Sequence, residues 1–330
     1  MMKKSLIALA VLAASGAAFA QSTTTVYGVL DTYFGSNKNT DALGVETTQT
    51  VLNAGGISHN RWGFKGSEDL GGGLKANFQL EQGFSMDKGT ADSAAQQFSR
   101  YAYVGLSGSF GEIKLGKTGT AYDDIQGNAD AVFDSSFSPV YYVFASTNYI
   151  WTPSNSFMYV SPTFGGFSAE FSNALDEKTA GTPYVGSFNI AYAAGPFAAS
   201  LGYQTQKVYT VDLNDTNFTR LNVAYDFGAA KLMGSYGKVA YNDVTKGDAN
   251  EYQLGVDVPV SAALTVSGSY AESKIAAVGA TAEVKSTGFG LGASYSLSKR
   301  TSIYGGYESD KVENTSTDHS LVALGIRHAF

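Results

Sequence analysis

The last seven residues of the chain, "LGIRHAF" at positions 324–330, decide the fold, because they read as a strand that continues to the final residue. With a period of two, side chains in such a strand alternate between two faces. One face carries Val322, Leu324, Ile326, His328 and Phe330, and the other carries Ala323, Gly325 and Arg327. An apolar end frays in water unless something holds it, so we expect this strand to pair with another part of the chain.

The same alternation recurs along the whole chain, for example in "GLKANFQLEQ" at 73–82 and "NFTRLNVAYDF" at 217–227. A soluble β-sandwich also alternates, but its strands average about 5 to 6 residues, whereas these segments run about 9 to 12, which matches a tilted bilayer crossing. About sixteen segments qualify: 24–34, 58–67, 73–84, 97–108, 111–117, 155–162, 166–175, 184–194, 196–207, 216–227, 229–240, 249–259, 261–273, 285–297, 299–310 and 319–330. An even number of this kind predicts an all-β fold, a 16-stranded antiparallel transmembrane β-barrel.

The connections between these segments are of two kinds, which alternate along the chain. Short ones such as "GSFG" and "AAGP" are followed by longer polar ones such as 35–57 and 85–96. Short turns on one rim and long loops on the other are typical of an outer-membrane barrel. Lipid leaves no backbone group unpaired, so the last strand must close the barrel against the first, near 24–34, and Phe330 is expected in the aromatic girdle at the interface.

The first twenty residues have the pattern of a secretory signal peptide. Lys3 and Lys4 precede an apolar run, and Ala18-Phe19-Ala20 forms a small-residue cleavage site. The alternative, a membrane anchor, needs a longer apolar run. We therefore expect residues 1–20 to be removed and residues 21–330 to form one barrel in the outer membrane of a Gram-negative bacterium.

Composition supports an exported strand protein. The chain has 38 Gly, 21 Tyr and 20 Phe against 6 Pro, and no Cys. Aromatic residues favour strands, and an exported protein without cysteine does not depend on disulfides. The net charge is −7, or about −9 without the two signal-peptide lysines, which argues against nucleic acid as a partner.

One connection, residues 118–154, is long and contains no alternating strand of barrel length. It carries many aromatic residues, among them Phe137, Tyr142 and Trp151, and such side chains are buried where a surface is available. We therefore predict that this third loop, called segment 118–154 below, folds into the lumen. Its acidic side chains are Asp123, Asp124, Asp130 and Asp134.

Basic residues lie on the inward faces of the early strands, namely Arg61, Lys65, Lys75 and Arg100. An acidic loop against a basic wall would form a constriction with an electric field across it. The alternative is that these are solvated charges on a wet face. The alternation around Arg100 is less regular than elsewhere, since Val104 and Leu106 share its parity.

Several long blocks resemble the trimeric porins of the neisserial and β-proteobacterial type. The blocks include "RWGFKGSEDLGGGLKANFQLEQGF", "FSRYAYVGLSGSFGEIKLGK", "SLSKRTSIYGGY" and "LGIRHAF", in order along the mature chain. The resemblance implies a homotrimer in outer-membrane lipid that passes ions and small hydrophilic solutes by passive diffusion. It also implies that Arg61, Arg100 and Lys117 line one side of the constriction. Where relatives commonly have an arginine, this chain has Thr152.

The charges predict weak selectivity with a preference for anions, because the bases lie on rigid strands. The loop aromatics either pack the loop against the wall or offer a surface to aromatic or sugar solutes.

Two rival classes are an outer-membrane barrel enzyme and a structural or adhesive barrel. The three histidines, His59, His319 and His328, have no acid or serine partner that the sequence can place, and no hydrolase or phosphate-loop motif occurs. We expect no enzyme activity, no cofactor and no resident metal. Loop acids such as Asp87 and Asp92, or Asp212 and Asp215, suit only weak binding of a divalent ion.

Overall fold

The computed structural model describes residues 23–177, 183–207, 215–243, 245–279 and 282–330, so the expected signal peptide lies outside the described residues. The strands up to segment 118–154 are β1 (Thr23–Thr40), β2 (Glu46–Ala54), β3 (Arg61–Gly71), β4 (Leu74–Ser85), β5 (Thr90–Ala91), β6 (Tyr101–Gly108) and β7 (Gly111–Lys117). The segment contains three short helices, η1 (Asp123–Ala129), α2 (Val140–Val143) and η2 (Ala145–Thr147). The later strands are β8 (Ser156–Val160), β9 (Phe167–Ala174), β10 (Tyr184–Ala194), β11 (Phe197–Lys207), β12 (Asp215–Asp226), β13 (Lys231–Tyr241), β14 (Ala249–Pro259), β15 (Leu264–Ile275), β16 (Val284–Ser296), β17 (Thr301–Val312) and β18 (Asp318–Ala329).

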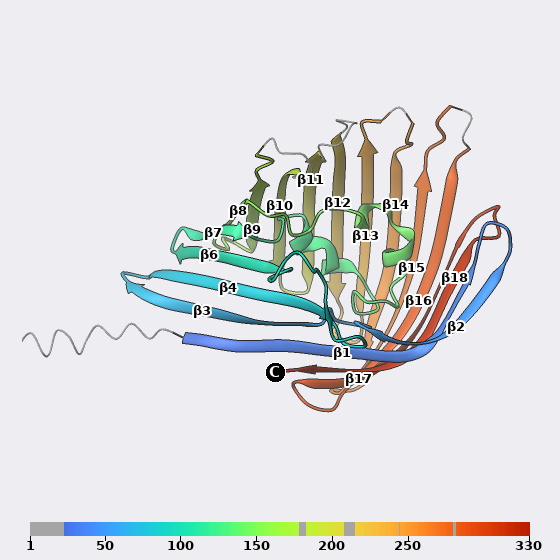
Figure 1. Cartoon of the computed structure of the whole chain (residues 1–330), viewed down its shortest axis with the longest axis horizontal. Helices are drawn as coiled ribbons and strands as arrows, with labels where there is room; N and C mark the ends of the chain where they lie inside the picture. The colour runs from blue at the N-terminus through green and yellow to red at the C-terminus, as the bar shows by residue number, and fades with distance from the viewer. Residues whose placement is uncertain (1–22, 178–182, 208–214, 244, 280–281) are drawn as a thin grey trace, which may run out of the picture.

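These strands form one antiparallel meander that closes on itself (Figure 1). β2 and β3 pair with successive halves of β1 and together make one crossing, while β5 pairs only with the end of β4. In the part of the chain that the structure describes, the wall therefore has sixteen strands, as predicted.

The barrel closes between its first and last strands. β1 pairs with β18 from Val29 opposite Ala329 to Thr40 opposite Asp318. The backbones of Gly28 and Phe330 exchange two hydrogen bonds, of 3.0 and 3.1 Å. The prediction that the apolar end is held by the first strand is confirmed, since the last residue has backbone partners.

Exposure alternates along the strands as the sequence pattern predicts. In β14, Leu254 is 70% exposed while Gln253 beside it is 2% exposed, and in β18 Leu324 is 73% exposed while Leu321 is 1% exposed. One face of the wall is thus apolar and exposed, and the other carries polar residues. No helix among the described residues is long and apolar enough to cross a membrane.

The first long connection differs from the prediction. Residues 35–57 were expected to form a loop, but β1 continues to Thr40 and β2 spans Glu46–Ala54. This hairpin is rich in Ser, Asn and Thr on both faces, so it lacks a regular apolar alternation. Backbone pairing joins its two strands, and an ion pair of 2.7 Å between Lys38 and Glu46 adds a side-chain contact. The turn at its tip is fixed by Asp41, whose Oδ1 accepts hydrogen bonds from the amides of Leu43 and Val45.

The short turns have the chemistry that tight turns need. Between β3 and β4, Gly71, Gly72 and Gly73 all have positive φ, at 86°, 63° and 82°. Other residues adopt this conformation only with strain, so the run "DLGGGL" is a turn between strands.

The wall has uneven height. Strands β6 to β9 contain 8, 7, 5 and 8 residues, whereas β10 to β18 contain 11 to 13. A tilted strand needs about 9 to 11 residues to cross a bilayer. The sector from β6 to β9, called the low wall below, is therefore shorter than a full crossing.

Segment 118–154 packs against the polar face of the later strands, and Figure 1 shows its short helices in front of β11 to β16. Phe137 is fully buried and lies close to Gly306, where an added Cβ would meet the ring at 2.4 Å. Tyr122 is also fully buried and makes an edge contact with Tyr149. Phe137 and Tyr122 therefore pack the segment against the wall, through ring contacts with Tyr304 and Phe218.

Candidate functional site

Two of the predicted bases converge on one acid. Arg61 begins β3, Arg100 precedes β6, and Glu81 lies on β4 between them, so strand pairing brings all three to the same level. The Nε of Arg100 is 2.6 Å from one Glu81 carboxylate oxygen, and the Nε of Arg61 is 3.7 Å from the other. Tyr27 also donates a hydrogen bond of 2.8 Å to Glu81. This group, called the Glu81 cluster below, has one excess positive charge.

Among the described residues, neither of the two predicted lysines of the wall forms an ion pair with Glu81. Lys65 is four residues from Arg61 along β3, about 13 Å at the usual strand rise, and its Nζ lies 4.9 Å from the centre of the Tyr27 ring. Lys75 is exposed near the turn between β3 and β4, opposite Asp69. The predicted basic wall is therefore a column along the early strands, with its strongest charge at the level of Arg61.

The bases nearest segment 118–154 contact its C-terminal end. The Nζ of Lys117 donates a hydrogen bond to the backbone oxygen of Thr152. The guanidinium of Arg100 lies 4.7 Å from the centre of the Trp151 ring. Thr152 thus supplies a backbone acceptor to a base of the wall, at the position where relatives were expected to have a cation.

The predicted acids separate into two groups. Asp123, Asp130 and Asp134 line a cavity of about 760 Å³ between the segment and the wall. Asp124 instead lines a smaller cavity of about 270 Å³ together with Lys114 of β7. Among the described residues, none of these four acids forms an ion pair with a base, and none of the five predicted bases lines either cavity.

Burial raises the pKa of all three predicted acids in the larger cavity. It raises the pKa of Asp123 to about 6, against the stabilising hydrogen bond that Tyr149 donates to the carboxylate. Burial, followed by repulsion from the neighbouring Asp134, raises the pKa of Asp130 well above its ordinary value. The hydroxyl of Ser138 donates to Asp130 at 2.6 Å. The three predicted acids of this cavity therefore carry less negative charge near neutral pH than three free carboxylates would.

Two charged residues of the wall that were not predicted as site residues hold the segment. Arg220 on β12 is 1% exposed, donates 2.8 Å to the Ser146 hydroxyl and lies over the Phe144 ring at 4.8 Å. Glu251 on β14 is fully buried and accepts hydrogen bonds from the amides of Ala145 and Ser146. Strand parity places both on the polar face, but their partners lie more than seventy residues away in the sequence.

Other polar side chains of the wall bind the segment backbone. Asn222 donates 2.6 Å to the carbonyl of Ile125, and Gln204 donates 3.0 Å to the carbonyl of Ile150. On β15, the Ser267 hydroxyl accepts 2.6 Å from the amide of Val132. These contacts come from separate strands, so they hold the segment across much of the later wall.

Of the histidines and loop acids named from the sequence, His59, Asp87 and Asp92 lie at the larger cavity. His59 lies 3.6 Å from Asp92, and Asp87 and Asp92 both line the cavity. Asp212 lies outside the described residues. His328 shares a hydrogen bond of 2.9 Å with Thr301.

Sequence comparison gives a family match and full-length relatives. The chain matches the family described as Gram-negative porin over residues 6–315. Outer membrane porin protein 32 of Delftia acidovorans is 38% identical, with 100% of each chain covered. Major outer membrane protein P.IB of Neisseria meningitidis serogroup B is 29% identical, again with 100% of each chain covered.

Solved structures share the fold. An anion-selective porin from Comamonas acidovorans superposes with a TM-score of 0.79 at 31% identity, covering 94% of this chain and 100% of that one. OmpT of Vibrio cholerae, in a structure described as the trimer form, gives a TM-score of 0.72 at 15% identity over 94% of this chain and 99% of that one. The second likeness is one of fold alone.

Proposed function

The chain belongs to the Gram-negative porin family, a family of outer-membrane channels and not of enzymes, and on that premise we propose that it forms a water-filled channel for passive diffusion of ions and small hydrophilic solutes. The observation that carries this proposal is the polar face of the closed wall, opposite the exposed apolar face. A wall with one polar and one apolar face fits a barrel that has water inside and lipid outside.

The proposed constriction lies between segment 118–154, folded into the lumen, and the early strands. Its support is the set of wall contacts that hold the segment and the cavity of about 760 Å³ that the segment lines. The Glu81 cluster, Lys65, Lys75 and Lys117 supply the basic side, and Asp123, Asp124, Asp130 and Asp134 the acidic side.

We propose a weak preference for anions. The Glu81 cluster retains one positive charge, and the raised pKa values of Asp123 and Asp130 weaken the acidic side. A relative at 31% identity is named an anion-selective porin, which favours the same sign here. A unit charge at 4 Å is worth about 1 kcal/mol in bulk water and about 4 kcal/mol at an effective dielectric of 20, so one side chain changes relative permeability severalfold.

The low wall supports a homotrimer as the assembly. Strands of 5 to 8 residues leave part of the bilayer thickness without a strand facing it. A neighbouring protomer placed against the low wall would cover that gap.

Two further parts of the proposal concern the ends of the chain. Phe330, 45% exposed at the end of the last strand, fits the aromatic girdle. Residues 1–20 remain the proposed signal peptide.

Single-channel recording in a planar bilayer, under a salt gradient, tests this function. We expect steady conductance that appears in steps of three, with a small reversal potential of the sign for anion preference. A bilayer that stays closed despite correct insertion would contradict the diffusion channel and leave a structural or solute-gated barrel.

A further inference from the structure

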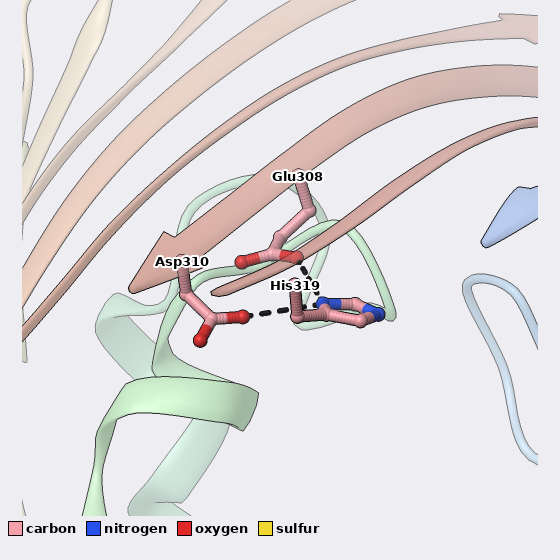
Figure 2. A group of neighbouring side chains, drawn as sticks. All are labelled: Glu308, Asp310 and His319. Carbon is pink, nitrogen blue, oxygen red and sulfur yellow. Dashed lines mark hydrogen bonds and ion pairs between the residues drawn. The ribbon is translucent and has the colours of Figure 1, made fainter. Parts of the chain in front are cut away.

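Three side chains on the polar face of the last two strands form a cluster that the proposed channel function does not use. Glu308 and Asp310 lie two residues apart on β17, so they share one face, and His319 on β18 is directly opposite Asp310. The Nδ1 of His319 is 3.0 Å from a Glu308 oxygen and 3.2 Å from an Asp310 oxygen. Figure 2 shows the imidazole with this nitrogen turned toward both carboxylates and the other nitrogen turned away.

We propose that Glu308, Asp310 and His319 bind a divalent transition-metal ion of the zinc type. From the sequence, His319 has no acid partner that can be placed, and no metal is expected. Strand pairing supplies two acid partners that lie within reach of the same histidine.

The distances fit a zinc site. Zinc is bound by imidazole nitrogen and carboxylate oxygen at about 2.0 to 2.2 Å with tetrahedral geometry, which places two ligand atoms about 3.4 Å apart. The three ligand atoms all lie within 4.8 Å of one another, and both distances from His319 are within a few tenths of an ångström of that value. Small side-chain movements would complete the site, with a remaining position open to water.

Glu308 supplies an independent reason to expect a cation. Its side chain is fully buried, and its Oε1 has no hydrogen-bond partner among the described residues. A buried carboxylate oxygen without a partner is costly, and a metal ion would satisfy it. In Figure 2 the Glu308 oxygen without a dashed line points to the side of the view where Asp310 is drawn.

The charge around the cluster also favours a cation. Within the described ranges, neither Glu308 nor Asp310 forms an ion pair with a lysine or arginine, so the histidine is the one ion-pair partner recorded for either acid. Two carboxylates with one imidazole suit zinc, whereas magnesium prefers oxygen ligands in an octahedron and retains its waters.

The site has a defined neighbour in segment 118–154. The Tyr142 ring stacks on the His319 imidazole with centroids 4.4 Å apart and an interplanar angle of 26°. Tyr142 belongs to α2 and lines the larger cavity. A metal at the cluster would therefore lie beneath the segment, at its contact with the wall.

Calorimetric titration of zinc chloride into the folded, chelator-treated full-length protein tests the proposal near neutral pH. We expect one equivalent of zinc per chain, with affinity that falls as the pH is lowered, because protonation of the imidazole removes a ligand. His319→Ala should weaken binding about 100-fold or more, and Asp310→Asn, which keeps the side-chain shape, at least about tenfold.

The control is His328→Ala, which removes a histidine from the same strand, outside the cluster, and should leave the affinity unchanged. Magnesium chloride added in molar excess over zinc should not displace the bound zinc. Absence of a one-equivalent site, or equal zinc binding by His319→Ala and Asp310→Asn, would overturn the proposal and leave an ion pair whose free oxygen is satisfied by water. The titration measures binding alone, so its outcome is independent of whether the barrel conducts.

Discussion

The strand wall and segment 118–154 are held by different interactions. Neighbouring strands of the wall are joined by continuous backbone ladders, so side chains need only suit the environment of their face. The segment has three short helices and is held by long-range side-chain contacts from Arg220, Asn222 and Glu251. Substitutions in the wall should therefore act on the stability of the barrel, and substitutions at the contact should act on the channel opening.

The largest effect is expected for a charge on the apolar face. Leu254 lies midway along β14 and is 70% exposed, so Leu254→Arg places a charge where we expect the bilayer centre. The expected loss in unfolding free energy is about 2 to 4 kcal/mol. It can be measured by equilibrium unfolding in lipid vesicles.

Leu43→Arg is the matched control, because Leu43 is 88% exposed at the tip of the hairpin between β1 and β2. We expect a change within about 0.5 kcal/mol. Equal losses for the two variants would remove the distinction between a lipid-facing wall and an aqueous tip.

A smaller effect is expected where the wall binds the segment. Glu251→Ala leaves the amides of Ala145 and Ser146 without their acceptor, which should cost about 1 to 3 kcal/mol and increase current noise. Unfolding in vesicles and single-channel recording measure the two effects.

The control is Glu272→Ala, which removes a half-buried acid paired with two lysines. It should cost less than about 1 kcal/mol of unfolding free energy and should not increase the current noise. Quiet channels in both variants would mean that Glu251 does not hold the segment.

Charge changes in the wall should alter selectivity more than stability. Arg100→Ser removes the excess positive charge of the Glu81 cluster, so the anion-to-cation permeability ratio should fall severalfold. Glu81→Gln should raise the same permeability ratio, because loss of the carboxylate charge increases the excess positive charge of the cluster. Reversal potentials under a salt gradient give both values, and an unchanged potential in both variants would place the cluster outside the conduction path.

The smallest effect is a pH dependence that arises in the segment. Asp123, with a pKa of about 6, is mostly charged at about pH 7.5 and mostly neutral at about pH 5, so acidification removes negative charge from the cavity. The reversal potential should shift toward anions over this range. Asp123→Asn should show a smaller shift, and an equal shift in both proteins would assign the titration to other groups.

The alternation of apolar and polar residues along the sequence was sufficient to predict most strands of the wall. The strand expected at 111–117 coincides with β7, and Leu324, on the apolar face of the expected last strand, is exposed. The same pattern did not predict the hairpin of β1 and β2, because both faces of that hairpin are largely polar. A pattern of period two is visible only where the two faces meet different environments.

The candidate site was predicted less completely, because pairing between distant residues leaves no local signal. Arg61 and Arg100 were predicted as site residues but Glu81 was not, although the strand alternation places Glu81 on the same face as Lys75. Arg220 lies in the stretch "NFTRLNVAYDF", but its role has no local signal, because its partner Ser146 is 74 residues away. His319 had no visible partner until strand pairing placed Asp310 opposite it.

The central claim, that segment 118–154 lines the conduction path, is tested most directly by charging one of its exposed residues. The chain has no cysteine, so Tyr141→Cys, at a position that is 67% exposed in the larger cavity, provides a unique thiol. Thiol reagents that attach a sulfonate or a trimethylammonium group should both reduce the single-channel current. The sulfonate should shift the reversal potential toward cations and the ammonium toward anions. Full modification with no change in current or potential for either reagent would contradict the claim.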